Sequence, residues 1–191
     1  MNIVHISTLY NPFVGGLEIA VQKIAEGQKI LQNDVTVVTS NFIGSLKNID
    51  YINGVAIIRV KVLRSKYPYL IYPIEIPKIF LEKANVIHGW SHNYLFVYKL
   101  IRYAKKVLRK PIVVYFIGVD YLKKHHNFLI RFIGYPYQKV ITNLFIDTID
   151  LALVTNDYEK KLLREIYGVD SVVVPHGIDE IYLKHPNMEK Y

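Results

Sequence analysis

Short apolar runs alternate along this chain with longer segments of helical periodicity. The runs are rich in β-branched residues and mostly lack strict apolar and polar alternation, which is typical of strands buried on both faces of a parallel sheet. They cover residues 3–9, 34–40, 85–92, 111–120, 150–156 and 171–174. Helices are expected between them, at 17–31, 76–83, 93–110 and 157–167. This order predicts an α/β fold: a Rossmann-like, three-layer domain with a mainly parallel sheet and its first strand central.

Residues 51–63 have a different pattern. Asn53-Gly54 is a strong signal for a type I′ turn, and apolar residues alternate with basic ones from Ile58 to Val62. We therefore expect a short hairpin at the sheet edge, with β-strands exposed on one side.

Residues 128–149 form a long apolar stretch that Gly134 and Pro136 interrupt. Because proline lacks the N–H that continues a helix, we expect a broken helix lying against the sheet or an acceptor groove.

The first strand is followed by the glycine pair Gly15-Gly16 and then by a helix that carries Glu18 in its first turn. A strand, a glycine loop and a helix start form the standard anion cradle of open α/β sheets, because unhindered N–H groups and the positive helix end point at one place. The loop is not G-x-G-x-x-G, and the strand at 34–40 ends without an acidic residue. The sequence therefore argues against a nicotinamide dinucleotide.

The strand at 85–92 ends in the ring-bearing residues His88, Trp90 and His92. Ligands of open α/β sheets bind beyond the carboxyl ends of the strands, where an indole can stack on a sugar and an imidazole can bond a hydroxyl. The alternative is that these side chains simply pack in the core. Paired His125-His126 do not share a helix face, so no metal is expected there.

The helix at 93–110 carries a basic face opposite its apolar stripe. Its basic residues are Lys99, Arg102, Lys106, Arg109 and Lys110. Such a face can rest on an anionic membrane surface. The alternative is an ordinary solvated helix face.

Composition and charge restrict the class of protein and the kind of binding partner to expect. The chain has 191 residues, no cysteine and a net charge of +8, which predicts one domain without disulfides that favours anionic partners. It has no apolar run approaching the roughly 18 residues of a membrane helix, nor the basic start of a signal peptide. We therefore expect a cytoplasmic protein, and the basic helix face leaves a peripheral position at a membrane open. A nucleic-acid partner is not expected, because no recognisable reading element is present.

Four motifs together resemble a known family. They are G-G-x-E at 15–18, N-V-I-H-G-W at 85–90, P-I-V-V-Y-F-I-G-V-D at 111–120 and V-V-V-P-H-G-I-D at 172–179. In this order they resemble the N-terminal, acceptor-side domain of the family 4 retaining glycosyltransferases of GT-B fold.

The resemblance implies two Rossmann-like domains that face a cleft, the first for the acceptor and the second for the nucleotide-sugar donor. It implies that the glycine loop approaches the donor phosphate and that neither a metal nor a cofactor is needed beyond the donor substrate. The substrate-binding residues it implies are Gly15, Gly16, Glu18, Trp90, Gly118 and Asp120. His88 and His92 are candidates for a catalytic role.

The chain departs from the family pattern at two positions. In the loop after the fourth core strand, Ile117 stands before Gly118 at the position where the family commonly has a histidine, and His176 stands where the family commonly has asparagine. The histidine's role is therefore expected to have moved, with His88 or His92 as candidates, or to be absent. His176 is expected to be a turn residue.

The expected domain organisation is a glycosyltransferase domain at residues 1–179 and the start of an interdomain linker or tail at 180–191. The donor-binding half expected from the family is not found in these residues. We therefore expect the acceptor-binding half of a glycosyltransferase that is inactive alone, as a truncated or split enzyme. The alternative is a non-catalytic module that binds a glycan or lipid, or recruits a partner.

Overall fold

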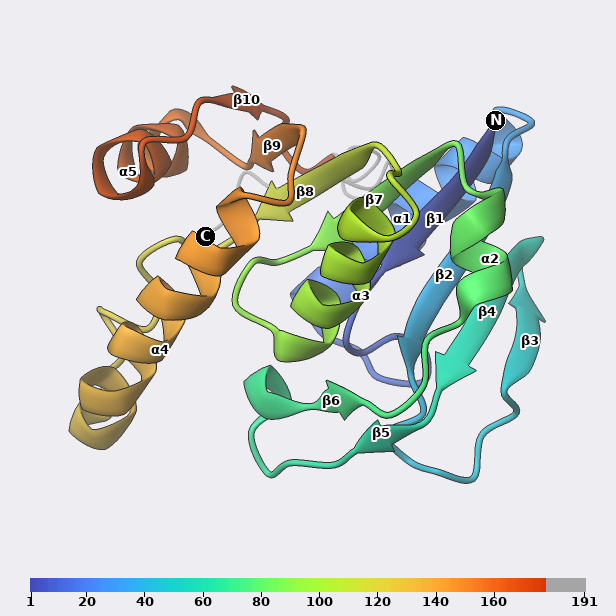
Figure 1. Ribbon diagram of the computed structural model, residues 1–191, viewed down its shortest axis with the longest axis horizontal. Coiled ribbons are helices and arrows are strands. Elements are labelled where there is room, and N and C mark those ends of the chain that lie inside the picture. Colours follow the sequence, from blue (N-terminus) through green and yellow to red (C-terminus); the bar gives the residue numbers. More distant parts are fainter. Residues whose placement is uncertain (178–191) are drawn as a thin grey trace, which may run out of the picture.

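A central, mainly parallel sheet organises the computed structural model, which describes residues 1–177 (Figure 1). The strand order is β10-β9-β8-β7-β1-β2-β4-β3. The strands are β1 (Asn2–Ile6), β2 (Asp34–Ser40), β3 (Ile49–Ile52), β4 (Val55–Val60), β7 (Val86–Trp90), β8 (Ile112–Phe116), β9 (Leu151–Val154) and β10 (Ser171–Val173). Only β3 runs antiparallel to its neighbour among the paired strands of this sheet in the described part of the chain. The predicted α/β fold is confirmed.

Helices cover both faces of this sheet. They are α1 (Gly16–Ile30), α2 (Lys78–Lys83), α3 (Leu95–Lys106), α4 (Phe128–Ile146) and α5 (Asp157–Tyr167). Helix α1 packs on one face through Val21 and Ala25, and α3 packs on the other through residues such as Leu100. Within residues 1–177, no helix is long and apolar enough to cross a membrane.

Strand β1 lies where the chain changes direction across the sheet. It pairs with β2 on one side and with β7 on the other, both in parallel. The connections leaving β1 and β2 proceed toward one edge, and those leaving β7 proceed toward the other. Such a switch point opens a crevice beyond the carboxyl ends of the strands, which is where α/β proteins bind their ligands.

The predicted hairpin has the expected turn, but its second strand is not exposed on one side as the sequence predicts. Asn53 and Gly54 have φ angles of 50° and 80°, as a type I′ turn requires. Strand β4, however, lies between β2 and β3, and Arg59 is only 3% exposed. Its guanidinium pairs with Asp50 at 3.2 Å and also donates to the carbonyl of Asn11 at 3.1 Å. A basic side chain that looked exposed in the sequence is therefore buried with its charge paired.

The loop after β4 adds a small second sheet below α3. It contains β5 (Val62–Leu63) and β6 (Tyr72–Pro73), with the 3₁₀ helix η1 (Pro68–Leu70) between them.

The predicted break in residues 128–149 does not occur. Helix α4 continues from Phe128 to Ile146 with Pro136 inside it. Pro136 is on an exposed side of the helix. Water can therefore solvate the carbonyl that the missing N–H leaves without a helical partner.

Candidate functional site

The crevice edge is formed by the loops that follow parallel strands. The loop after β1 contacts the loop after β2: the Ser40 amide donates to the Thr8 carbonyl at 3.2 Å, and the rings of Phe13 and Phe42 lie 5.9 Å apart. The loops after β7 and β8 leave the same edge, because these strands are parallel to β1. The structure therefore places residues from four distant segments along one edge of the sheet.

The glycine pair lies at the start of α1. Gly15 is the N-cap residue with an extended backbone, and no side chain caps the helix. A Cβ built on Gly16 meets no atom within 4 Å, so the space above this first helical residue is open. A Cβ on Gly15 would instead lie 2.4 Å from the Glu18 carboxylate oxygen. An anion that approaches this helix end would meet free N–H groups once the Glu18 carboxylate moves aside.

His88 and Trp90 lie together but inside the domain. Their rings stack at 4.7 Å on the α1 side of the sheet, and Trp90 also stacks on Tyr115 at 5.2 Å. Trp90 is fully buried, and its indole N–H donates to His5 Nδ1 at 3.0 Å. This arrangement does not fit the predicted stacking of Trp90 on a sugar ring. It fits the alternative, in which these side chains pack the core.

His92 is separated from this stack. Its ring lies 5.0 Å from that of Phe116, and its Nε2 lies 3.1 Å from the amide nitrogen of Gln138 in α4. His92 is fully buried, so neither candidate catalytic histidine reaches the open crevice in this structure.

The buried histidines are held in their neutral form. Burial lowers the pKa of His5 to about 4, although its hydrogen bond to Gln28 opposes this shift, and lowers that of His92 to about 3. Burial and the neighbouring His5 put the pKa of His88 well below its usual range. In the unfolded chain all three would have a pKa near 6.5.

This shift predicts that acid destabilises the domain. Below about pH 6.5 the unfolded chain binds protons that the folded chain does not, so the free energy of unfolding falls as pH falls. Each histidine contributes up to about 1.4 kcal/mol per pH unit until its folded pKa is reached. Urea unfolding from about pH 7.5 to 5 measures this slope. His92→Asn should flatten it, whereas His126→Gln, at an exposed histidine, should not; a flat profile for the native chain would contradict the expectation.

The loop after β8 holds Gly118 and Asp120 in defined positions. Gly118 has a φ of 66°, and its amide donates to the buried carboxylate of Glu159 at 2.6 Å. Asp120 accepts hydrogen bonds from Tyr158 at 2.9 Å and from Lys124. Burial raises the pKa of Asp120, but the bonds from Lys124 and Tyr158 outweigh it and lower the pKa overall. Asp120 is thus an ionised group beside the crevice with its charge partly compensated.

Residues 14–181 match the sequence profile of Glycosyltransferase Family 4. The chain belongs to this family. The structure is similar to that of sucrose-phosphate synthase from Thermosynechococcus elongatus, with a TM-score of 0.73 and 14% sequence identity. The similarity covers 96% of this chain and 52% of that one, so the chain spans about half the length of this similar protein. At this identity the likeness shows the fold alone. A search among curated proteins found no match.

The two residues at which the chain departs from the family 4 pattern lie close to the stacked rings of His88, Trp90 and Tyr115. Ile117 is half-buried and packs against the cluster that contains Tyr115 and Trp90. His176 is exposed, and its ring stacks on that of Tyr115 at 5.2 Å. Through His176, the exposed residues 174–177 contact the buried ring of Tyr115. Ile178 and Asp179 of the same motif lie outside the described residues, as does the predicted linker at 180–191.

Two residues that the sequence did not indicate position the loop after β8 of the family 4 domain. Gln138 donates to the carbonyls of Gly118 and Val119 at 3.1 and 3.2 Å, and it accepts from the Leu122 amide at 3.3 Å. Glu159 holds the Gly118 amide. Both are polar residues buried in helices, and their partners lie about 20 and 41 residues away in the sequence. In the sequence, the one available sign of Gln138 and Glu159 is a polar residue at a helical position that should face the core.

Proposed function

We propose that this domain is the acceptor-binding half of a glycosyltransferase that moves a sugar from a nucleotide-sugar to a glycan, lipid or small-molecule acceptor. The observation that carries the proposal is the start of α1 after β1, where no side chain caps the helix and the space above Gly16 is open. Membership of Glycosyltransferase Family 4 supplies the reaction class.

The helix end has a defined role in this reaction. Sugar transfer releases a nucleoside diphosphate, so negative charge builds on the leaving oxygen. The free N–H groups and positive dipole at the start of α1 stabilise that charge without a side chain. Gly16 lets a phosphate approach the backbone, and Glu18 withdraws from Gly15 as it arrives. The acceptor occupies the crevice over the neighbouring loops, with Gly118 and Asp120 at one end.

Transfer further requires a donor-binding half that closes the crevice, either a further domain or a separate subunit. An open crevice leaves the reacting sugar in contact with water, which weakens electrostatic stabilisation of the transition state.

The test is to assay the purified chain alone and together with a donor half. The chain alone is expected to show no sugar transfer from nucleotide-sugars, and addition of a donor half from the same genome is expected to restore it. Transfer by the chain alone would overturn the proposed division of roles. A mixture that stays inactive with every donor half, with both proteins folded, would favour a non-catalytic module.

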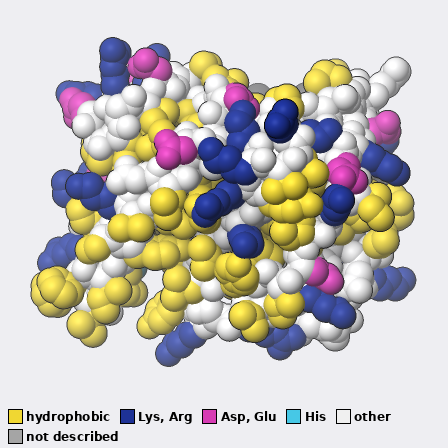
Figure 2. Space-filling model, in the orientation of Figure 1, with side chains coloured by type: hydrophobic (Ala, Val, Ile, Leu, Met, Phe, Trp, Pro, Cys, Tyr) yellow, Lys and Arg dark blue, Asp and Glu magenta, His cyan; other side chains and the backbone are white. Residues whose placement is uncertain are grey.

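We also propose that the acceptor is presented at an anionic membrane surface. On α3, the side chains of Arg102 and Lys106 are exposed, and Lys99 lies over the ring of Tyr72, 5.6 Å from its centroid. Figure 2 shows Lys and Arg side chains gathered over α3. The exposed side chains Tyr67 and Leu70 lie in the loop that packs beside α3.

Helix α4 adds exposed apolar side chains from the stretch that the sequence predicts to lie against the sheet or an acceptor groove. Phe128, Leu129, Phe132 and Ile133 are each 62–69% exposed. They belong to the first two turns of α4, the part of the helix at the lower left of Figure 1, and Figure 2 shows hydrophobic side chains in that region. Exposed apolar side chains beside a basic patch are typical of surfaces that bind at the lipid headgroup boundary.

Vesicle co-sedimentation tests this surface. Each basic residue near an anionic surface contributes on the order of 1 kcal/mol. Reversing Lys99, Arg102, Lys106 and Arg109 to Glu should therefore abolish binding to anionic vesicles, as should high salt. Phe128→Ser with Phe132→Ser should weaken binding at any salt concentration. As a matched control, reversal of Lys160 and Lys161 on α5 should have little effect. Equal binding to neutral and anionic vesicles, or to neither, would leave α3 a solvated face.

A further inference from the structure

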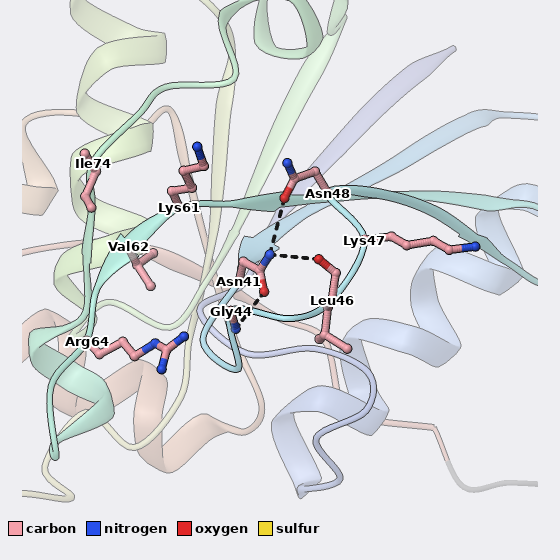
Figure 3. A pocket seen from close by; sticks show the side chains of 9 residues that line it. All are labelled: Asn41, Gly44, Leu46, Lys47, Asn48, Lys61, Val62, Arg64 and Ile74. Atoms are coloured by element: carbon pink, nitrogen blue, oxygen red, sulfur yellow. Dashed lines mark hydrogen bonds between the residues drawn. The ribbon is translucent and has the colours of Figure 1, made fainter.

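A cavity at the end of β2 and β4 lies outside the residues discussed so far. It has a volume of about 620 Å³ and lies between the loop after β2, residues 41–48, and the segment after β4, residues 61–64 (Figure 3). These two strands are parallel and adjacent, so the cavity lies at the same edge of the sheet as the start of α1.

The lining of this cavity is positively charged. Lys47, Lys61 and Arg64 line it, and no carboxylate does. Two acidic side chains near these segments have partners of their own: Asp50 pairs with Arg59 at 3.2 Å, and Glu75 accepts from the backbone amide of the lining residue Lys61 at 3.1 Å. Three cations around a cavity without a carboxylate favour an anionic ligand.

The loop that forms one wall is held in shape by Asn41. This buried side chain donates to the Leu46 carbonyl at 3.0 Å and to the Asn48 side chain at 3.3 Å, while its oxygen accepts from the Gly44 amide at 3.0 Å. One amide thus fixes three points of a short loop, and the wall is formed before any ligand arrives.

Gly44 allows the Arg64 guanidinium to lie directly on this loop. Arg64 Nη2 donates to the Ile43 carbonyl at 2.8 Å, and a Cβ on Gly44 would lie 1.8 Å from that nitrogen. Gly44 also has a φ of 85°, which other residues rarely adopt. Figure 3 shows the guanidinium pointing toward Asn41 and Gly44, while the side chains of Lys47 and Lys61 extend away from it. The guanidinium has five N–H donors, so some remain for a ligand.

The cavity loop contacts the loop that precedes α1. Phe42 of the cavity loop packs on Phe13, and Arg59 of β4 donates to the carbonyl of Asn11. The cavity and the start of α1 are therefore held in place by the same set of contacts.

We propose that this cavity binds a phosphate group of the acceptor, as a monoester or diester. A guanidinium binds phosphate through two parallel hydrogen bonds, and the flexible lysines neutralise the remaining charge. The inference rests on the proposed function, since it assigns the phosphate to the acceptor of that reaction. The phosphate belongs either to a free sugar phosphate or to a phospholipid headgroup.

The test measures binding of inorganic phosphate and glucose 6-phosphate to the whole chain by calorimetry, at constant ionic strength with chloride as the reference anion. Saturable binding is expected. Lys47→Gln with Arg64→Gln should weaken it about tenfold or more, as loss of two charge-assisted contacts predicts. The matched pair Lys160→Gln with Lys161→Gln on α5 removes the same charge and should leave binding unchanged.

The source of the phosphate is then distinguished with vesicles containing phosphatidylglycerol. Because α3 is itself proposed to bind anionic vesicles, both chains compared in this step also carry Arg102→Gln and Lys106→Gln. If the cavity pair then loses affinity for glucose 6-phosphate but not for vesicles, the ligand is a free phosphate ester; if vesicle binding is also lost, it is a headgroup. Absence of saturable phosphate binding, or equal weakening by both pairs, would overturn the proposal. Thermal unfolding of each variant confirms that it is folded. Sugar transfer to a neutral acceptor by a variant lacking the cavity charges would leave the proposed function intact, so the two proposals fail separately.

Discussion

Gly16→Val is expected to reduce sugar transfer about 100-fold or more in the transferase assembled with a donor half, while the domain remains folded. Nothing in the domain occupies the space where the new side chain would lie, so the fold tolerates it. The valine would occupy the space that a phosphate needs to reach the first N–H groups of α1, and displacement by about 1 Å at a reacting centre costs on the order of 100-fold. Initial rates at saturating acceptor measure the effect.

Gly27→Val is the matched control for this substitution. Gly27 lies in the same helix, and a Cβ there also meets no atom within 4 Å. It is two turns or more from the helix start, so transfer should be unchanged. Full activity of Gly16→Val would show that the glycine pair is only a turn between β1 and α1.

Trp90→Ala is expected to have the largest effect on stability, lowering the free energy of unfolding by about 3–5 kcal/mol. The indole is fully buried, stacks on His88 and Tyr115, and donates to His5. Its removal leaves a cavity and leaves the His5 nitrogen without its donor. Urea unfolding at neutral pH measures the loss.

Trp90→Phe separates packing from hydrogen bonding at this position. It keeps an aromatic ring in the stack and removes the N–H, so a smaller loss is expected than for alanine. A Trp90→Ala chain as stable as the native one, but impaired in acceptor binding, would instead favour the substrate-stacking role.

The fold could be predicted from sequence because strand burial leaves a local signal. Residues 34–40, for example, form β2 with the predicted bounds, since a β-branched run with no exposed face suits little else. The Asn53-Gly54 turn was equally local. By contrast, Arg59 belongs to a strand with an alternating pattern, and its burial depends on Asp50 in the neighbouring strand β3 and on Asn11, 48 residues away.

The candidate site was harder to predict because exposure at a strand end depends on the layers around it. His88 and Trp90 are two residues apart, so both point to the same face, and that face is covered by α1. The residue types alone do not indicate that α1 covers these two rings. Glycine positions were more informative, since Gly15 and Gly16 were placed at a helix start by a pattern of strand, loop and helix that is itself local.

The single tryptophan of the chain gives the domain a built-in optical probe. Trp90 is the only such residue in the sequence, and it lies fully buried in the ring stack that ends at His176. Its emission should therefore be blue-shifted in the folded domain and move to longer wavelength when the α1 side of the sheet opens. A ligand that displaces His176 from Tyr115 should alter this emission, whereas lipid bound on the α3 face should leave it unchanged. One fluorescence spectrum can thus distinguish events in the crevice from events on the outer surface.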